Sequence, residues 1–158
     1  MSHIDEQIFE ALKTSVLYAD MSRTVENSPY HREQNVAVHT DMVVRSYYEH
    51  ASEFEILSDR SIRIGAIACM LHDIGKPSSL IQKHSKERGD YVSFTGHERK
   101  SARLAETWLT NNFTAHLSDK EIAAICFIIE QHKPWDIVHV DKVSHIISTI
   151  ASLLDRVS

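Results

Sequence analysis

Residues 66–77 read Ala-Ile-Ala-Cys-Met-Leu-His-Asp-Ile-Gly-Lys-Pro, and this stretch decides the fold because an apolar run ends there in a polar pair. The apolar spacing before the pair predicts a helix over about 59–73, which the glycine and the proline end. His72 and Asp73 lie about 100° apart on such a helix, so both reach one ion only near the helix end. Other helices must then supply the remaining ligands.

The rest of the chain favours an all-α fold, because four glycines and three prolines are too few for many hairpins. Apolar spacing predicts about six helices, over 3–19, 33–53, 59–73, 96–112, 118–132 and 140–157. Residues 77–95 are expected to form a loop, with at most a short strand at 91–94. Ser118 and Glu121 have the spacing of a capping box. A length of 158 residues fits one domain over 1–158.

Eleven histidines are many for a chain of this length, and several of them continue apolar helical stripes. Six ligand-type residues from five helices are expected to point inward: His39, His72, Asp73, His97, His132 and Asp155. One buried histidine is more often a satisfied core residue. Six buried polar groups without a cation would cost several kcal/mol for each uncompensated group. A divalent ion offsets this cost, since imidazole and carboxylate are its ordinary ligands.

The charge distribution points to an anion-binding segment in an otherwise acidic chain. The net charge of -5 argues against a general nucleic-acid or DNA binder. Residues 76–103, however, carry seven basic and three acidic side chains, a local charge of +4 against -9 for the remainder. This segment is either a solvated surface or a rim that attracts anions. Its candidate substrate-binding residues are Lys76, Lys83, Arg88 and Lys100.

Membrane insertion and export are not expected. The longest uninterrupted apolar run, 122–129, is eight residues, and a bilayer span needs roughly 18 to 20. Asp5 and Glu6 stand where a secretory signal would carry positive charge. Cys69 and Cys126 lie in separate apolar runs, which suits reduced core residues. The sequence therefore predicts a cytoplasmic protein.

The order of these motifs resembles that of the HD-domain metal-dependent phosphohydrolases, over about residues 39–155. One group of HD domains looks most similar to this chain. The similarity lies in residues 71–77, in Phe-Thr-Gly-His-Glu at 94–98 and in Ser-Ala at 101–102. That group is attached to bacterial CCA-adding tRNA nucleotidyltransferases and RNA end-healing enzymes, and it removes 2′,3′-cyclic phosphates and related phosphomonoesters. The resemblance implies an HD-type helical bundle with its metal site between helices. The absence of a Gly-Tyr-Pro motif argues against a cyclic di-nucleotide phosphodiesterase.

The resemblance also implies roles for individual residues. It assigns His39, His72, Asp73 and Asp155 to one metal ion and His97 and His132 to a second. One or two divalent ions, drawn from Mn, Fe, Ni, Co, Zn or Mg, are the expected cofactors.

The chemistry that follows is metal-assisted hydrolysis of a nucleotide or RNA-end phosphoester. Asp73 is the expected bridging ligand and could orient or deprotonate the attacking water. Lys76 follows a helix-ending glycine at the mouth of the site, so it is expected to bind the phosphate as a point charge. Otherwise Lys76 only stabilises the helix C-terminus, by about 0.3–1 kcal/mol. Two alternative functions are a mixed-valence di-iron oxygenase on the same fold and a non-catalytic nucleotide-binding module.

Overall fold

The computed structural model describes residues 3–26, 35–51 and 58–132. Within these ranges the chain is mostly helical, with one two-stranded antiparallel sheet, so the all-α prediction is confirmed. In chain order the elements are α1 (His3–Lys13), α2 (Val16–Ser22), α3 (Val36–Ala51), α4 (Asp59–Leu71), α5 (Lys76–Ser79), β1 (Ile81–Ser85), β2 (Gly89–Ser93), α6 (His97–Asn112) and α7 (Asp119–Glu130). The expected helix over 140–157 lies outside the described residues, and the single domain over 1–158 stays a prediction.

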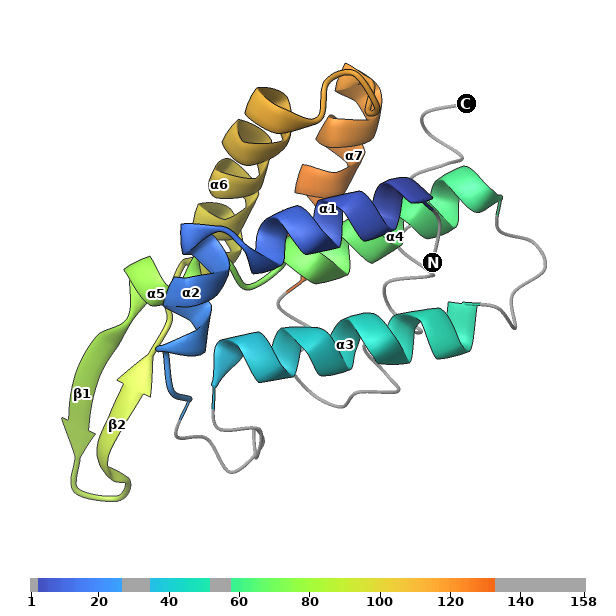
Figure 1. Cartoon of the computed structure of the whole chain (residues 1–158). Helices are drawn as coiled ribbons and strands as arrows, with labels where there is room; N and C mark the ends of the chain where they lie inside the picture. The colour runs from blue at the N-terminus through green and yellow to red at the C-terminus, as the bar shows by residue number, and fades with distance from the viewer. Residues whose placement is uncertain (1–2, 27–34, 52–57, 133–158) are drawn as a thin grey trace.

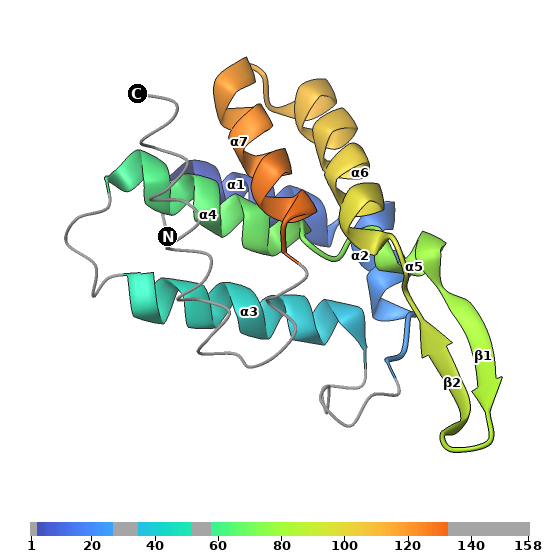
Figure 2. The ribbon, with the colours of Figure 1, turned by 180° about the vertical axis from the view of Figure 1, so that it is seen from behind.

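Helix α4 is the central element of the bundle. It packs against α1, α3 and α7, and α6 lies beside α7 in an antiparallel pair (Figures 1 and 2). Every residue from Ile64 to Leu71 is buried, which explains why this segment reads as apolar on all sides. Tyr47 of α3 donates a hydrogen bond to the carbonyl of Ile62 at 2.9 Å and ties α3 to α4. Helix α4 is therefore held by three neighbouring helices.

The first predicted helix is two helices in the structure. Thr14 and Ser15 interrupt it, because their hydroxyls bond to backbone carbonyls of the preceding turn and Ser15 caps α2. Ile4, Ile8, Leu12 and Val16 recur at steps of four and so form an apolar helical stripe, of which Ile8 and Leu12 are buried. Val16, the next member, is 73% exposed because the break rotates it away from the core.

The capping box predicted at the start of the fifth helix is confirmed. The Ser118 hydroxyl accepts a hydrogen bond from the Glu121 backbone N–H at 3.1 Å, and the Glu121 carboxylate accepts one from the Ser118 N–H at 3.0 Å. These contacts satisfy N–H groups that the first turn of a helix leaves unpaired. The box fixes the start of α7 and hence the place where α7 ends.

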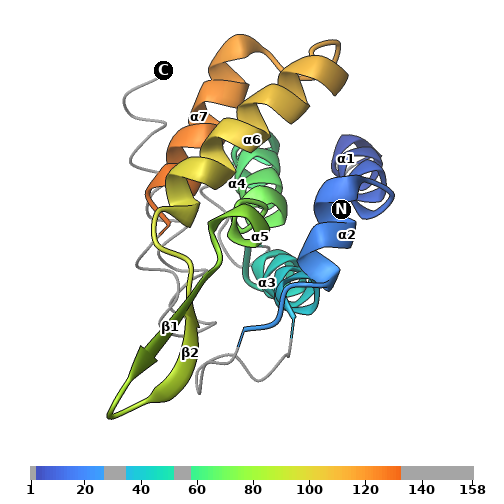
Figure 3. The same ribbon diagram turned by 90° about the vertical axis from the view of Figure 1, so that its left-hand side faces the viewer.

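The segment expected to be a loop contains short α5 and the β1–β2 hairpin. Five residue pairs form its ladder, and Gly89 supplies the positive φ of 67° that the three-residue connection needs. The hairpin extends away from the helices (Figure 3). Weak alternation of apolar and polar residues in 81–85 left this strand unpredicted.

None of the helices in the described residues is long and apolar enough to cross a membrane.

Candidate metal centre

The side chain of Asp73 is the centre of a buried cluster of imidazoles. Helix α4 ends at Leu71, His72 is its C-cap, and Asp73 lies in the turn that follows. Both carboxylate oxygens are fully buried. The position just beyond a helix end lets His72 and Asp73 face the same point, as the sequence required.

Each oxygen of Asp73 faces two imidazoles. Oδ2 lies 3.1 Å from His72 Nε2 and 3.8 Å from His39 Nε2. Oδ1 lies 3.3 Å from His97 Nε2 and 3.4 Å from His132 Nε2. The five residues thus form two groups of ligand atoms, within 4.8 Å of one another in each group, that share Asp73. All five side chains are buried.

Backbone carbonyls fix the orientation of three of these imidazoles. The Nδ1 atoms of His72, His97 and His132 lie within hydrogen-bonding distance of the carbonyl three residues earlier. A carbonyl oxygen only accepts, so each Nδ1 carries the proton and donates it. In a neutral ring, the Nε2 atom that faces Asp73 therefore presents a lone pair. This tautomer is the one a metal ion needs.

The short distance between the Nε2 atoms of His97 and His132 indicates that the site suits a cation. Their Nε2 atoms lie 2.9 Å apart, and both face Asp73 Oδ1. Three electron-pair donors that converge in this way repel each other unless a proton or a metal ion lies among them. Imidazole and carboxylate donors in sets of three fit a divalent transition metal. The residues therefore fit the predicted cofactor.

The electrostatics of the cluster keep Asp73 ionised. Burial alone raises the pKa of Asp73, but the positive charges of His72 and Lys76 outweigh it and hold the pKa well below its usual value. The pKa of His97 is raised: burial lowers it, and the hydrogen bond and charge of Asp73 more than offset this. The negative charge of Asp73 thus favours a positive charge at the point where these donors converge.

Lys76 occupies a different position from the one expected. The sequence placed it at the mouth of the site, whereas in the structure it is 2% exposed. Its ammonium lies 2.7 Å from Glu26 Oε1 and 3.3 Å from Asp73 Oδ2. Sequence reasoning missed Glu26, because it lies 50 residues before Lys76 and outside any helical stripe. No sequence signal pointed to it.

Gly75 brings α6 close to the end of α4. A Cβ atom at this position would lie 2.5 Å from the Ser101 backbone nitrogen and 2.9 Å from the His97 carbonyl oxygen. The Gly75 N–H instead donates a hydrogen bond to the Ser101 hydroxyl at 2.8 Å. The absence of a side chain thus lets His97, the first residue of α6, reach Asp73.

The remaining predicted site residues lie elsewhere. Lys83 is on β1, Arg88 is in the hairpin connection and Lys100 is on the first turns of α6, and all three are exposed. Asp155 lies outside the described residues.

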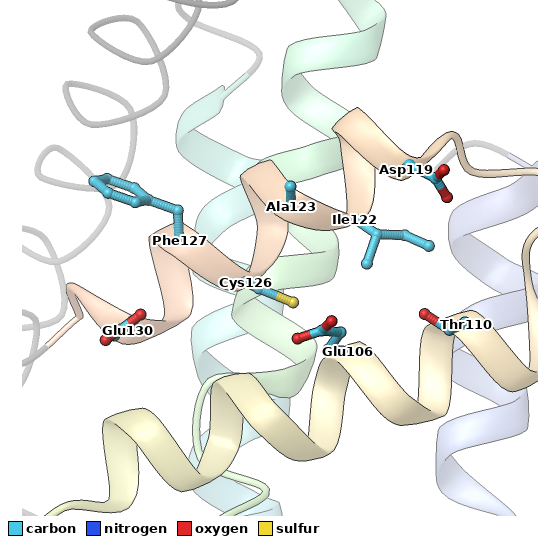
Figure 4. A pocket seen from close by; sticks show the side chains of 8 residues that line it. All are labelled: Glu106, Thr110, Asp119, Ile122, Ala123, Cys126, Phe127 and Glu130. Carbon is cyan, nitrogen blue, oxygen red and sulfur yellow. The ribbon is translucent and has the colours of Figure 1, made fainter.

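A groove of about 550 Å³ between α6 and α7 contains none of the metal-centre residues. Its lining residues are Glu106, Thr110, Asp119, Ile122, Ala123, Cys126, Phe127 and Glu130 (Figure 4). Burial, together with the charges of Glu106 and Glu130, raises the pKa of Cys126 to about 12. The thiol stays protonated at neutral pH and is a poor nucleophile. We therefore place the chemistry at the Asp73 cluster.

An all-α bundle with a shared aspartate between two pairs of histidines defines a class of metal-binding domain. Comparison with known families agrees: the HD domain matches residues 36–158, which is more than half of the chain. The protein belongs to the HD domain family. No curated protein and no solved structure gives a significant match. Membership of the family implies hydrolase-type activity that depends on a divalent metal.

Proposed function

We propose that the protein is a metal-dependent phosphohydrolase that acts on a nucleotide or RNA-end phosphoester. One observation carries this proposal: the buried carboxylate of Asp73 lies between two histidine pairs, one at each oxygen. Family membership supports hydrolysis. The substrate class rests on the resemblance of residues 71–77 and 94–102 to one group of HD domains.

The metal-ligand candidates divide into two sets. We propose that one divalent ion is held by His39, His72, Asp73 and Asp155, and a second by Asp73, His97 and His132. When bound, such ions would supply a water of lowered pKa and positive charge for the phosphoryl oxygens. Mn, Fe, Ni, Co, Zn and Mg are the candidates.

The chain itself contributes orientation and charge. The low pKa of Asp73 keeps the carboxylate ionised, so it can orient the attacking water through a hydrogen bond. The ammonium of Lys76, which Glu26 holds beside Asp73, places a fixed positive charge at the site. A buried charge of fixed position acts more strongly on a phosphate than a solvated one does. Lys100 lies one helical turn beyond His97 and extends this positive charge outward.

Elemental analysis followed by a substrate panel tests the proposal. The purified full chain would be analysed for bound metal and then assayed, with each candidate ion, against three groups of phosphoesters. These are 2′,3′-cyclic nucleotides, nucleoside monophosphates and 3′,5′-cyclic di-nucleotides. We expect turnover of the first two groups and poor turnover of the third.

Three results would contradict the proposal, and two of them identify the alternatives. Highest efficiency on cyclic di-nucleotides would contradict the substrate class. A coloured, iron-dependent protein that consumes O2 without hydrolysing phosphoesters would be an oxygenase. Tight nucleotide binding without turnover in any metal would identify a binding module.

A further inference from the structure

The β1–β2 hairpin has two chemically different faces. Residues directly opposite each other in an antiparallel pair share a face, and successive pairs alternate between faces. The Lys83–Tyr91 face is formed by Ile81, Lys83, Ser85, Gly89, Tyr91 and Ser93. The other face carries Gln82, His84, Asp90 and Val92. The hairpin extends away from the helices (Figure 3), and four of the five β1 residues are exposed, whereas four of the five β2 residues are partly buried.

Positive charge and an aromatic ring are concentrated on the Lys83–Tyr91 face. Lys83 is exposed and lies opposite Tyr91, and the guanidinium of Arg88 lies 4.0 Å from the centre of the Tyr91 ring. The acidic residue of the ladder, Asp90, points to the other face, where His84 Nδ1 lies 2.8 Å from its carboxylate. The six members of the Lys83–Tyr91 face thus include one cation, Lys83, and no acidic side chain, and Arg88 from the connection adds a second cation stacked on Tyr91.

The base of the hairpin is part of the metal centre. Lys76 leads into β1 through α5, and β2 is followed by Phe94, whose carbonyl accepts the hydrogen bond from His97 Nδ1 at 2.9 Å. The Phe94 ring centre lies 5.4 Å from the Lys76 ammonium. Tyr91 is three residues from Phe94, about 10 Å along an extended strand. The Lys83–Tyr91 face thus lies on the strand that leads along the chain to Phe94 and His97, next to the metal centre.

We propose that the Lys83–Tyr91 face binds the single-stranded nucleic acid whose terminal phosphate enters the metal centre. Phosphates contact Lys83 and Arg88, and a base stacks on the Tyr91–Arg88 pair. Single strands are bound by this combination of backbone charge and aromatic or guanidinium stacking. This proposal rests on the proposed function, which supplies the reaction at the terminal phosphate. It goes beyond that function because it names a nucleic-acid polymer as the preferred substrate and a free nucleotide as a poorer one.

A binding measurement tests the face without reference to catalysis. The probe is a fluorescent single-stranded RNA of about ten nucleotides, titrated with the full chain in fluorescence anisotropy. We expect Lys83→Glu and Tyr91→Leu each to weaken binding by about tenfold, and the slope against salt to fall by about one in Lys83→Glu. Lys120→Glu on α7 is the matched charge control and should bind as the wild type does. Equal losses in Lys83→Glu and Lys120→Glu would overturn the proposal.

Competition and kinetics complete the test. A polyglutamate peptide or phosphatidylserine vesicles that displace the RNA at equal charge would overturn the proposal, because the face would then bind any polyanion.

With substrate ending in a 2′,3′-cyclic phosphate, Lys83→Glu should raise KM for the RNA about tenfold more than KM for the mononucleotide. If the wild type hydrolyses neither substrate, the proposed function fails while the anisotropy result still decides on the face. If it binds no RNA, the face is wrong whatever the hydrolysis shows.

Discussion

At the scale of the single residue, Asp73 combines contacts that are rarely found on one side chain. Two imidazoles face each of its oxygens, and the Lys76 ammonium lies beside Oδ2. The carboxylate is surrounded by groups that are cationic or hold lone pairs, and it is shielded from water. Its negative charge would therefore attract a metal ion more strongly than any other feature of the site.

Replacing Asp73 by asparagine should remove the metal while the fold persists. The amide keeps the shape of the side chain but has no charge, and one of its two heavy atoms cannot accept. We expect metal content near zero and loss of hydrolysis, with a helical circular dichroism spectrum like that of the wild type. Inductively coupled plasma analysis of the purified variant measures the metal. Full metal content or full activity would show that Asp73 is not a ligand.

Glu26 should contribute mainly through Lys76. Glu26→Gln removes the nearer of two carboxylates beside the buried ammonium, while Asp73 Oδ2 stays at 3.3 Å. Breaking a buried ion pair from one side costs at most about 3–5 kcal/mol. We expect a loss of up to this size in the free energy of unfolding, measured by urea denaturation of the metal-free protein. The double variant Glu26→Gln/Lys76→Met should recover part of it, since no buried charge of the pair remains. A double variant less stable than Glu26→Gln would contradict this account.

At the scale of the element, most of the candidate metal ligands lie at helix ends. His72 and Asp73 follow α4, His97 begins α6 and His132 follows α7. Helix ends expose the backbone groups that orient the imidazoles, and a side chain there can point along the helix axis. Small shifts of a helix end therefore displace ligands directly.

Gly75→Ala should displace one such end. The added Cβ would meet the Ser101 backbone nitrogen at 2.5 Å, which α6 can relieve only by moving away. We expect a loss of about 1–3 kcal/mol in stability and a lower metal content, because His97 moves with α6. Gly89→Ala is the control for metal content: its Cβ meets nothing within 4 Å, and the strain at its φ of 67° falls on the hairpin connection, so metal content should stay at the wild-type value. Equal metal content in both variants would show that the close contact does not position His97.

The capping box of α7 predicts a pH dependence of stability. The pKa of Glu121 is lowered: burial raises it, but the hydrogen bonds with Ser118 and the nearby Arg60 outweigh burial. A carboxylate with a lowered pKa stabilises the fold above its ordinary value of 4.5, and this contribution is lost as the pH falls through the lower folded value. Glu121→Ala should therefore unfold more easily than the wild type at pH 7.

The difference between the two proteins should shrink below pH 4.5 as the wild-type carboxyl becomes protonated. Because Glu121 is partly exposed, we expect less than about 1 kcal/mol at pH 7. Thermal unfolding of both proteins across this pH range measures it. A gap that widens in acid would contradict the sign.

At the scale of the whole molecule, the sequence predicted the helices more accurately than the segments that connect them. Apolar stripes such as Val36, Val43 and Tyr47 located buried faces, because helical spacing depends on local order alone. The break at Thr14 and Ser15 escaped this reasoning, since two side-chain hydroxyls decided it. The Glu26–Lys76 pair escaped as well, because tertiary packing brings the two residues together across 50 positions.

The candidate site shows the same contrast between what helical spacing predicts and what tertiary packing decides. Residues on stripes could be predicted to face inward, and the structure brings His39 to within 3.8 Å of Asp73 from another helix. Helical spacing alone does not tell which imidazole faces which oxygen, because that depends on how α3, α6 and α7 cross α4; the grouping came from the family resemblance. The hairpin beside the site also lacked a signal, since β1 is mostly exposed, β2 is partly buried, and neither strand has a buried residue.

The arrangement of α6 against α7 leads to the last prediction, that His97 and His132 act as one unit. They come from different helices, yet their Nε2 atoms are 2.9 Å apart and both face Oδ1 of Asp73. If they hold a second ion together, His97→Ala and His132→Ala should each lower the metal content toward one ion per chain and reduce turnover by similar large factors. The double variant should be little worse than either single one, because the ion is already lost. Metal analysis and kinetics on the three variants would settle this, and single variants with wild-type metal content and turnover would reduce the two histidines to packing.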